Sequence, residues 1–171
     1  NSGKTTLFNA LTGARARTGN YPGVTVERRV GRTKLPGGAN APSEVDIVDL
    51  PGTYSLTARS PEEQVAIDAV LPTQGRHAAA LVVVCDAGAL GRHLYLALQL
   101  RETGVPTVIA LNMMDEARAA GIAIDVAALA RELGAEVVPV VARTGEGVDA
   151  LRAAIGRAID LGVSSPLALP L

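Results

Sequence analysis

Aromatic residues, cysteine and an excess of either charge are what this sequence has least of. Only 2% of its 171 residues are aromatic while 48% are hydrophobic, so the core must be built from Val, Leu, Ile and Ala. Cys85 is the one cysteine, which excludes an internal disulfide and suits a reducing compartment. The formal net charge of −1 gives no general attraction to nucleic acid or an anionic membrane, so no nucleic-acid partner is expected.

Long apolar runs are also missing. The longest uninterrupted one, residues 78–85, is far shorter than the roughly 20 residues that a membrane helix needs. No signal peptide is visible either. The length and composition therefore predict one soluble domain with a sizeable core and no membrane segment.

The apolar pattern predicts strands that alternate with helices. A helix over 4–11 and an irregular loop over 14–25 precede two antiparallel strands over 26–35 and 44–50. Helices are then predicted over 61–71, 90–102, 125–133 and 148–159, around buried strands over 79–85, 106–112 and 136–141. Continuous Val/Ile/Leu strands between helices indicate a sheet covered on both faces. The expected fold class is α/β, a doubly wound, mostly parallel sheet with one antiparallel strand.

The chain opens on the second half of a phosphate-binding P-loop, the pattern G-x-x-x-x-G-K-[ST]. Ser2, Gly3, Lys4, Thr5 and Thr6 are expected to bind phosphate through backbone N–H groups at the start of the first helix. Lys4 should reach the β- and γ-phosphates, and the Thr5 hydroxyl should ligate Mg²⁺. Since the leading Gly and the strand before it are absent, we expect a P-loop GTPase fold that lacks its first, central strand.

Two further loops carry residues that fit Mg²⁺ and the γ-phosphate. Thr25 lies where a P-loop GTPase places the threonine that caps both. Asp49 and Gly52 match D-x-x-G, in which Asp49 holds Mg²⁺ through a water and the Gly52 amide senses the γ-phosphate. Thr53 follows Gly52 in place of the Gln that usually orients the attacking water, which favours low intrinsic activity.

The last two loops fit a guanine base. Asn112, Met113 and Asp115 match N-x-x-D, in which the Asp115 carboxylate accepts hydrogen bonds from guanine N1–H and N2–H₂. Asn112 should hold the loops together, and the Met113 thioether replaces the more common Lys beside the base. Ala142, next to Arg143, should offer its backbone N–H to guanine O6. With the five elements in register, the sequence predicts a GTPase that binds GTP or GDP with Mg²⁺.

These motifs resemble the GTPase domain of the bacterial ferrous-iron transport protein B (FeoB) family. The similar segments are NSGKTTLFN (1–9), GNYPGVTVE (19–27), DLPGTYSL (49–56), SPEE (60–63) and NMMD (112–115). Tyr21 departs from the tryptophan that the family usually has. The resemblance implies a G domain over 1–160 on the cytoplasmic face of the bacterial inner membrane, then a linker or truncated domain over 161–171. Its partner would be the transmembrane region of the same full-length protein, and iron transport is implied by the resemblance alone.

The resemblance also implies a monovalent cation in the reaction. The family's asparagine at the position of Asn1 is the K⁺ ligand of a cation-activated GTPase, so Asn1 joins Lys4, Thr25 and Gly52 as expected catalytic residues. Asn1 alternatively only hydrogen-bonds the loop backbone. Two other functions stay open: a nucleotide-sensing module with negligible hydrolysis, and a related GTPase of RNA modification or ribosome assembly. The neutral charge balance argues against the second.

Overall fold

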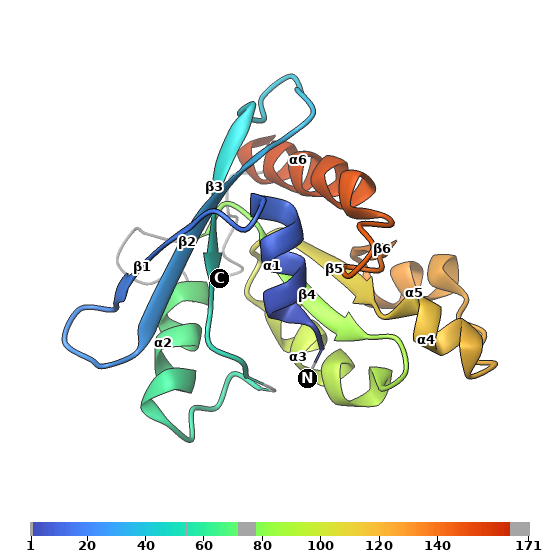
Figure 1. Ribbon diagram of the computed structural model, residues 1–171, viewed down its shortest axis with the longest axis horizontal. Helices are drawn as coiled ribbons and strands as arrows, with labels where there is room; N and C mark the ends of the chain where they lie inside the picture. Colours follow the sequence, from blue (N-terminus) through green and yellow to red (C-terminus); the bar gives the residue numbers. More distant parts are fainter. Residues whose placement is uncertain (1, 54, 72–77, 165–171) are drawn as a thin grey trace, which may run out of the picture.

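The computed structural model describes residues 2–53, 55–71 and 78–164, and shows strands flanked by helices (Figure 1). In this part of the chain the strands form two three-stranded sheets, of order β1-β2-β3 and β4-β5-β6. The elements are α1 (Lys4–Thr12), β1 (Ala16–Asn20), β2 (Glu27–Lys34), β3 (Glu44–Asp49), α2 (Pro61–Val70), β4 (Leu81–Asp86), α3 (Leu90–Glu102), β5 (Thr107–Asn112), α4 (Met114–Ala119), α5 (Val126–Leu133), β6 (Glu136–Pro139) and α6 (Val148–Ser164). The α/β fold class is confirmed.

The antiparallel sheet contains a strand that the sequence did not predict. β2 pairs antiparallel with both β1 and β3, so it is the strand that runs opposite to its two neighbours. β1 occupies part of the stretch 14–25, for which an irregular loop was expected, and that prediction was wrong for Ala16–Asn20. Four of its five residues are exposed. Because β1 has no apolar alternation, only its backbone pairing with β2 defines it as a strand.

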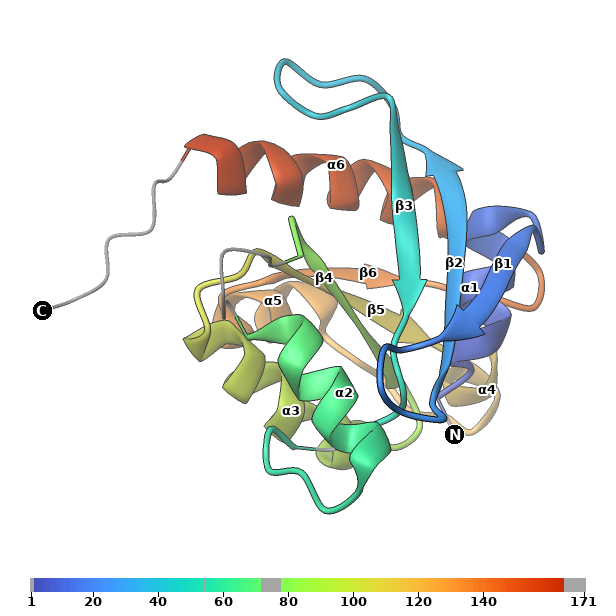
Figure 2. The ribbon, with the colours of Figure 1, turned by 90° about the vertical axis from the view of Figure 1, so that its left-hand side faces the viewer.

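The parallel sheet is covered on both faces, as expected. Ile109 and Leu111 of β5 pack with α3, α4 and α5, and the alternate residues Val108 and Ala110 pack with α1 and α6. All four are at most 1% exposed. Figure 2 shows α6 and α3 on opposite sides of β4, β5 and β6. This two-sided burial explains why the strands read as continuous Val/Ile/Leu runs. Cys85 of β4 is fully buried, as a core thiol should be.

The helix ends follow the sequence closely. The Ser60 hydroxyl accepts a hydrogen bond from the Glu63 N–H at 3.2 Å, and Asp125 accepts one from the Ala128 N–H at 2.9 Å. The six-residue α4 was not predicted, and α6 continues to Ser164. The first four residues of the stretch 161–171, expected as a linker, are therefore helical. Within the three described ranges, no helix is long and apolar enough to cross a bilayer.

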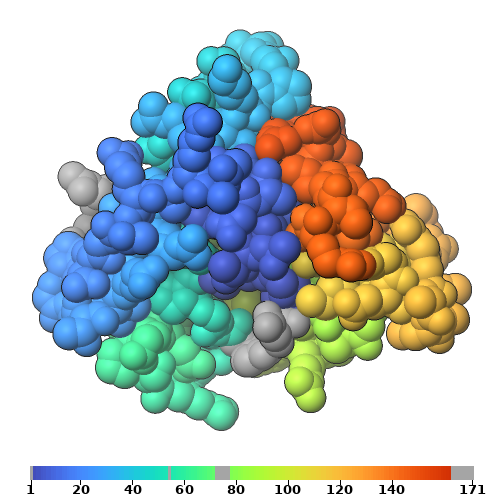
Figure 3. All heavy atoms as spheres, viewed as in Figure 1, coloured from blue at the N-terminus to red at the C-terminus, as the bar shows by residue number. Residues whose placement is uncertain are grey.

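Helix α1 holds the two sheets and α6 together. On one face of the molecule α1 lies between the antiparallel strands and α6 (Figure 3). Arg152 of α6 donates hydrogen bonds to the carbonyls of Ala10 and Leu11, both at 3.1 Å, and to the Thr33 hydroxyl of β2 at 3.1 Å. A guanidinium at the C-terminal carbonyls of a helix satisfies groups that have no partner within the helix. These bonds fix the C-terminal end of α1 against α6 and β2.

Candidate nucleotide site

The P-loop turns into α1 at a glycine that tolerates no side chain. Gly3 has φ +73°, in the left-handed region, and its carbonyl accepts the first helical bond from Leu7 N at 3.0 Å. A Cβ on Gly3 would lie 2.5 Å from Asn112 Nδ2 and 3.4 Å from the terminal methyl of Met113. The P-loop and the N-x-x-D loop therefore touch, with the Met113 side chain beside the P-loop backbone.

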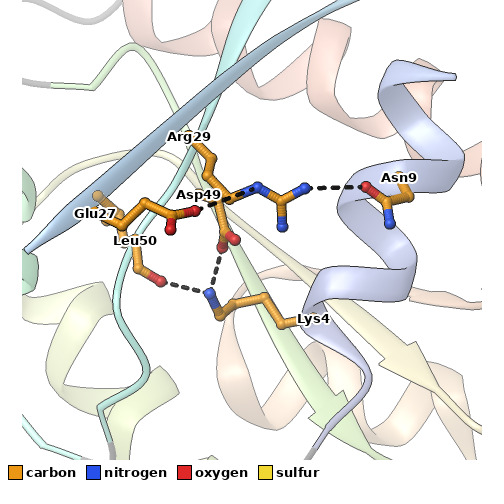
Figure 4. A network of polar contacts seen from close by, with 6 residues as sticks. All are labelled: Lys4, Asn9, Glu27, Arg29, Asp49 and Leu50. Atoms are coloured by element: carbon orange, nitrogen blue, oxygen red, sulfur yellow. Dashed lines mark hydrogen bonds and ion pairs between the residues drawn. The ribbon is translucent and has the colours of Figure 1, made fainter. Parts of the chain in front are cut away.

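Lys4 and Asp49 form an ion pair although they are 45 residues apart. The Lys4 ammonium donates to the Asp49 carboxylate and to the Leu50 carbonyl (Figure 4). The Asp49 side chain is 11% exposed and the Lys4 side chain 37%. The start of α1 and the end of β3 thus bring together the two motifs predicted to bind phosphate and Mg²⁺.

Asn112 connects the loops around the site. Its side-chain amide donates to the Ser2 carbonyl at 3.0 Å, and its amide oxygen accepts from the Ala142 N–H at 3.0 Å. Asn112 is 3% exposed, and its bond to the Ala142 N–H is shielded from water, whereas the bond to the half-buried Ser2 is only partly shielded. It holds the loops together as expected for this position. The buried Asn112 amide oxygen needs a hydrogen-bond donor, and the Ala142 N–H supplies it. This differs from the expected role of the Ala142 N–H as the donor to guanine O6.

The Asp115 carboxylate bonds to an arginine of the last loop. Arg143 Nη2 donates to Asp115 Oδ2 at 2.8 Å. This hydrogen bond is the main reason that the pKa of Asp115 lies below its usual value. The side chains of Asp115 and Arg143 are 32% and 75% exposed, so the pair lies at the surface and can separate at little cost. Asp115 lies in the first turn of α4, two residues after Met113, whose side chain lies beside the P-loop.

Thr25 lies apart from the P-loop contacts. It is exposed in the loop between β1 and β2, where it lines a cavity of about 670 Å³ with Tyr21, Val26 and Pro61. Neither Lys4 nor Asp49 is among the described residues that line this cavity. The Tyr21 hydroxyl is buried and has no hydrogen-bond partner in the described part of the chain. Burial raises the pKa of Tyr21, with a smaller lowering by Arg28 and a smaller rise from Asp49.

The other predicted residues of the described part of the chain are exposed. Thr5 and Thr6 are exposed in the first turn of α1, and Gly52 is exposed with nothing within 4 Å of where a Cβ would lie. Asn1, the predicted K⁺ ligand, lies outside the described residues.

No sequence motif predicts two of the contacts near the site. Gln99 of α3 accepts a hydrogen bond from the Leu56 N–H at 2.8 Å, which ties the loop after Asp49 to that helix. Arg29 of β2 lies over the ring of Phe8, 5.1 Å from its centroid. Arg29 also lies opposite Asp49 in the register of β2 on β3.

The arrangement suits a ligand with phosphates at one end and a purine at the other. A lysine and helix N–H groups at α1 attract phosphate oxygens, while oxygen groups such as the Thr5 hydroxyl and the Asp49 carboxylate suit Mg²⁺. The carboxylate of Asp115 can accept two hydrogen bonds from a base that offers two adjacent donors. Asn112 sets the spacing between the two ends, because it bonds to the P-loop and to the last loop together.

Comparisons with known proteins point to one protein family. Residues 1–155 match the family model described as ferrous iron transport protein B. The Fe(2+) transporter FeoB of Salmonella typhimurium is 50% identical over 161 residues, which are 92% of this chain and 20% of that protein. The cytosolic domain of L. pneumophila FeoB is 45% identical with a TM-score of 0.82, over 92% of this chain and 64% of that one. An S. thermophilus NFeoB variant bound to GDP is 44% identical with a TM-score of 0.77, over 91% of this chain and 59% of that one.

Proposed function

Because the chain belongs to the family of ferrous iron transport protein B, we propose that it is a GTP-hydrolysing switch that regulates a ferrous-iron transporter. The chain spans 20% of the length of the curated relative, so the transport step and the transmembrane partner are inferred from that relative's name. From the family resemblance we also propose that the chain lies at the cytoplasmic face of the bacterial inner membrane, with the transmembrane region of the full-length protein as partner.

The observation that carries the proposal is the pair of hydrogen bonds made by Asn112. They hold the P-loop at Ser2 and the last loop at Ala142 on either side of one buried amide. A nucleotide with its phosphates on Gly3 and Lys4 then presents its base to Asp115. Guanine fits because its N1–H and N2–H₂ are adjacent donors, an arrangement that adenine does not offer. Since the Ala142 N–H is engaged, we assign the contact with guanine O6 to the backbone N–H of Arg143.

The phosphate end supplies groups for Mg²⁺. In the proposed complex Lys4 bonds to the β- and γ-phosphates instead of Asp49, and Asp49 and the Thr5 hydroxyl become available to the metal. When bound there, Mg²⁺ would neutralise negative charge on the phosphates. Thr25 and the Gly52 amide bind at the γ-phosphate after the loop between β1 and β2 has closed over it. Loss of the γ-phosphate releases both loops, which makes the domain a switch.

Hydrolysis is proposed to be slow and stimulated by potassium. The Thr53 hydroxyl donates to the Ser55 carbonyl at 2.6 Å and accepts from the Ser55 N–H at 3.3 Å, so it is not directed at an attacking water. The missing stabilisation is assigned to K⁺ held by the Asn1 amide oxygen and by backbone carbonyls of residues 19–25. This assignment rests on the family resemblance and on the position of Asn1 two residues before Gly3.

Nucleotide competition tests the proposal. GTP and GDP should displace a fluorescent guanine nucleotide at least tenfold more effectively than ATP, and equal displacement by ATP would refute guanine specificity. Single-turnover hydrolysis with protein in excess then separates a slow GTPase from a nucleotide-sensing module without hydrolysis. Turnover should be faster in potassium than in sodium and lose that difference in Asn1→Ala. Equal rates in both salts would be consistent with GTPase activity but would refute its stimulation by K⁺.

A further inference from the structure

Arg29 occupies an unusual place between α1 and the end of β3. On the antiparallel sheet it lies directly opposite Asp49, and directly opposite residues carry their side chains on the same face. This face is covered by α1, since Arg29 contacts Phe8 and Asn9 of that helix. Arg29 therefore shares one layer with the Lys4–Asp49 pair, and Figure 4 shows its guanidinium on the same side of the strands as that pair.

The guanidinium of Arg29 is held in place by three neighbours. Its central carbon lies 5.1 Å from the centroid of the Phe8 ring, and Nη2 donates to Asn9 Oδ1 at 3.5 Å. Nε lies 3.9 Å from the Glu27 carboxylate. The Arg29 side chain is only 27% exposed, whereas that of Glu27 is 66% exposed. A solvated partner at that distance compensates little of the positive charge.

A second arginine on the same strand shows what an ordinary cross-strand pair looks like. Arg32 also lies opposite an aspartate of β3, and it bonds to that residue, Asp46, at 2.9 Å. Arg29 makes no such bond among the described contacts, because the carboxylate of Asp49 bonds to Lys4 and the guanidinium is turned toward α1. Arg32 has two exposed carboxylate partners, Asp46 at 2.9 Å and Glu44 at 3.7 Å, whereas among the described ion pairs Arg29 has only the solvated Glu27 at 3.9 Å, so its positive charge beside α1 is less compensated.

We propose that Arg29 is a fixed positive charge of the nucleotide site, additional to Lys4, which attracts the polyphosphate through the α1–β2–β3 layer without touching it. The inference rests on the proposed function. Lys4 is the mobile cation that bonds to phosphate, and Arg29 is the stationary one. Its field acts in opposite directions on the two ionic ligands: it favours the anionic nucleotide and opposes Mg²⁺. In this sense Arg29 is a positioning residue and not a catalytic one.

Because the expected changes in nucleotide affinity and in Mg²⁺ affinity have opposite signs, a general destabilisation of the fold cannot produce both. In the full chain, Arg29→Gln keeps the length and a donor but removes the charge, and Arg29→Lys keeps the charge. Affinities for GTP and GDP are measured in EDTA, and the half-saturating Mg²⁺ concentration is measured on the nucleotide complex. Arg29→Gln should weaken GTP binding in EDTA on the order of tenfold, and GDP binding by less, because GTP carries the larger charge. The half-saturating Mg²⁺ concentration should fall.

Two further variants complete the test. Arg29→Lys should stay within about twofold of wild type, since an electrostatic attraction that acts without contact depends on the charge and not on the group that carries it. Arg32→Gln, the matched control on the same strand, should change neither quantity. The proposal is overturned if Arg29→Gln leaves both quantities unchanged, or weakens nucleotide and Mg²⁺ together without rescue by Lys. Failure of the wild-type chain to bind any guanine nucleotide would instead refute the proposed function.

Discussion

Replacing Asn112 with alanine should separate the loops of the site and destabilise the whole domain. The variant leaves the Ser2 carbonyl and the Ala142 N–H without their partner. A buried polar group left unsatisfied costs about 1–3 kcal/mol. Ala142 is buried while Ser2 is only half-buried and can take up water, so the expected loss is about 2–4 kcal/mol in the free energy of unfolding.

Urea unfolding followed by circular dichroism measures that loss, and GDP titration measures the second effect. With the two loops no longer joined, GDP affinity should fall at least tenfold, because the bound nucleotide must itself order them. Asn40→Ala is the control, because Asn40 is exposed and its hydrogen bond to the Asp160 carboxylate is donated by the backbone N–H, which alanine retains. If Asn112→Ala unfolds at the same urea concentration as the control and binds GDP equally well, the role assigned to Asn112 is wrong.

Three further predictions concern other parts of the fold. Asp115→Asn should lose GTP affinity more than tenfold and gain affinity for xanthine nucleotides, because an amide replaces the acceptor for two guanine donors; competition binding measures both changes, with Glu116→Gln as control. Arg152→Met should lower the free energy of unfolding by about 2–4 kcal/mol, since the carbonyls at the end of α1 lose a charged donor, and an unchanged urea midpoint would contradict this. Burial raises the pKa of Cys85 from 9.0 to about 12, so the thiol contributes stability fully below pH 9 and loses it as the pH rises toward 12. Alkylation of native Cys85 at pH 8 should accordingly be far slower than alkylation of the urea-unfolded chain, and equal rates would contradict its burial.

The sequence alone determined those features that depend on neighbouring residues. The caps at Ser60 and Asp125 are local hydrogen bonds between residues three apart, so the residue types alone predict them. The strands of the parallel sheet were predictable because burial on both faces demands an unbroken apolar run, as in β5. The motif residues Lys4, Asp49, Asn112 and Asp115 were also found from the sequence, since phosphate, metal and guanine each require particular side-chain groups.

Only the tertiary structure decided how distant segments meet. β1 exists because its backbone groups pair with β2, a property that exposed side chains do not encode. The Ala142 N–H is directed at Asn112 because a buried amide oxygen 30 residues away requires a donor. Arg29 and Arg32 are both arginines on β2. They have different partners because α1 packs against only one face of the sheet. Sequence spacing specifies chemistry and local conformation, whereas strand register and helix packing decide which charges share a buried layer.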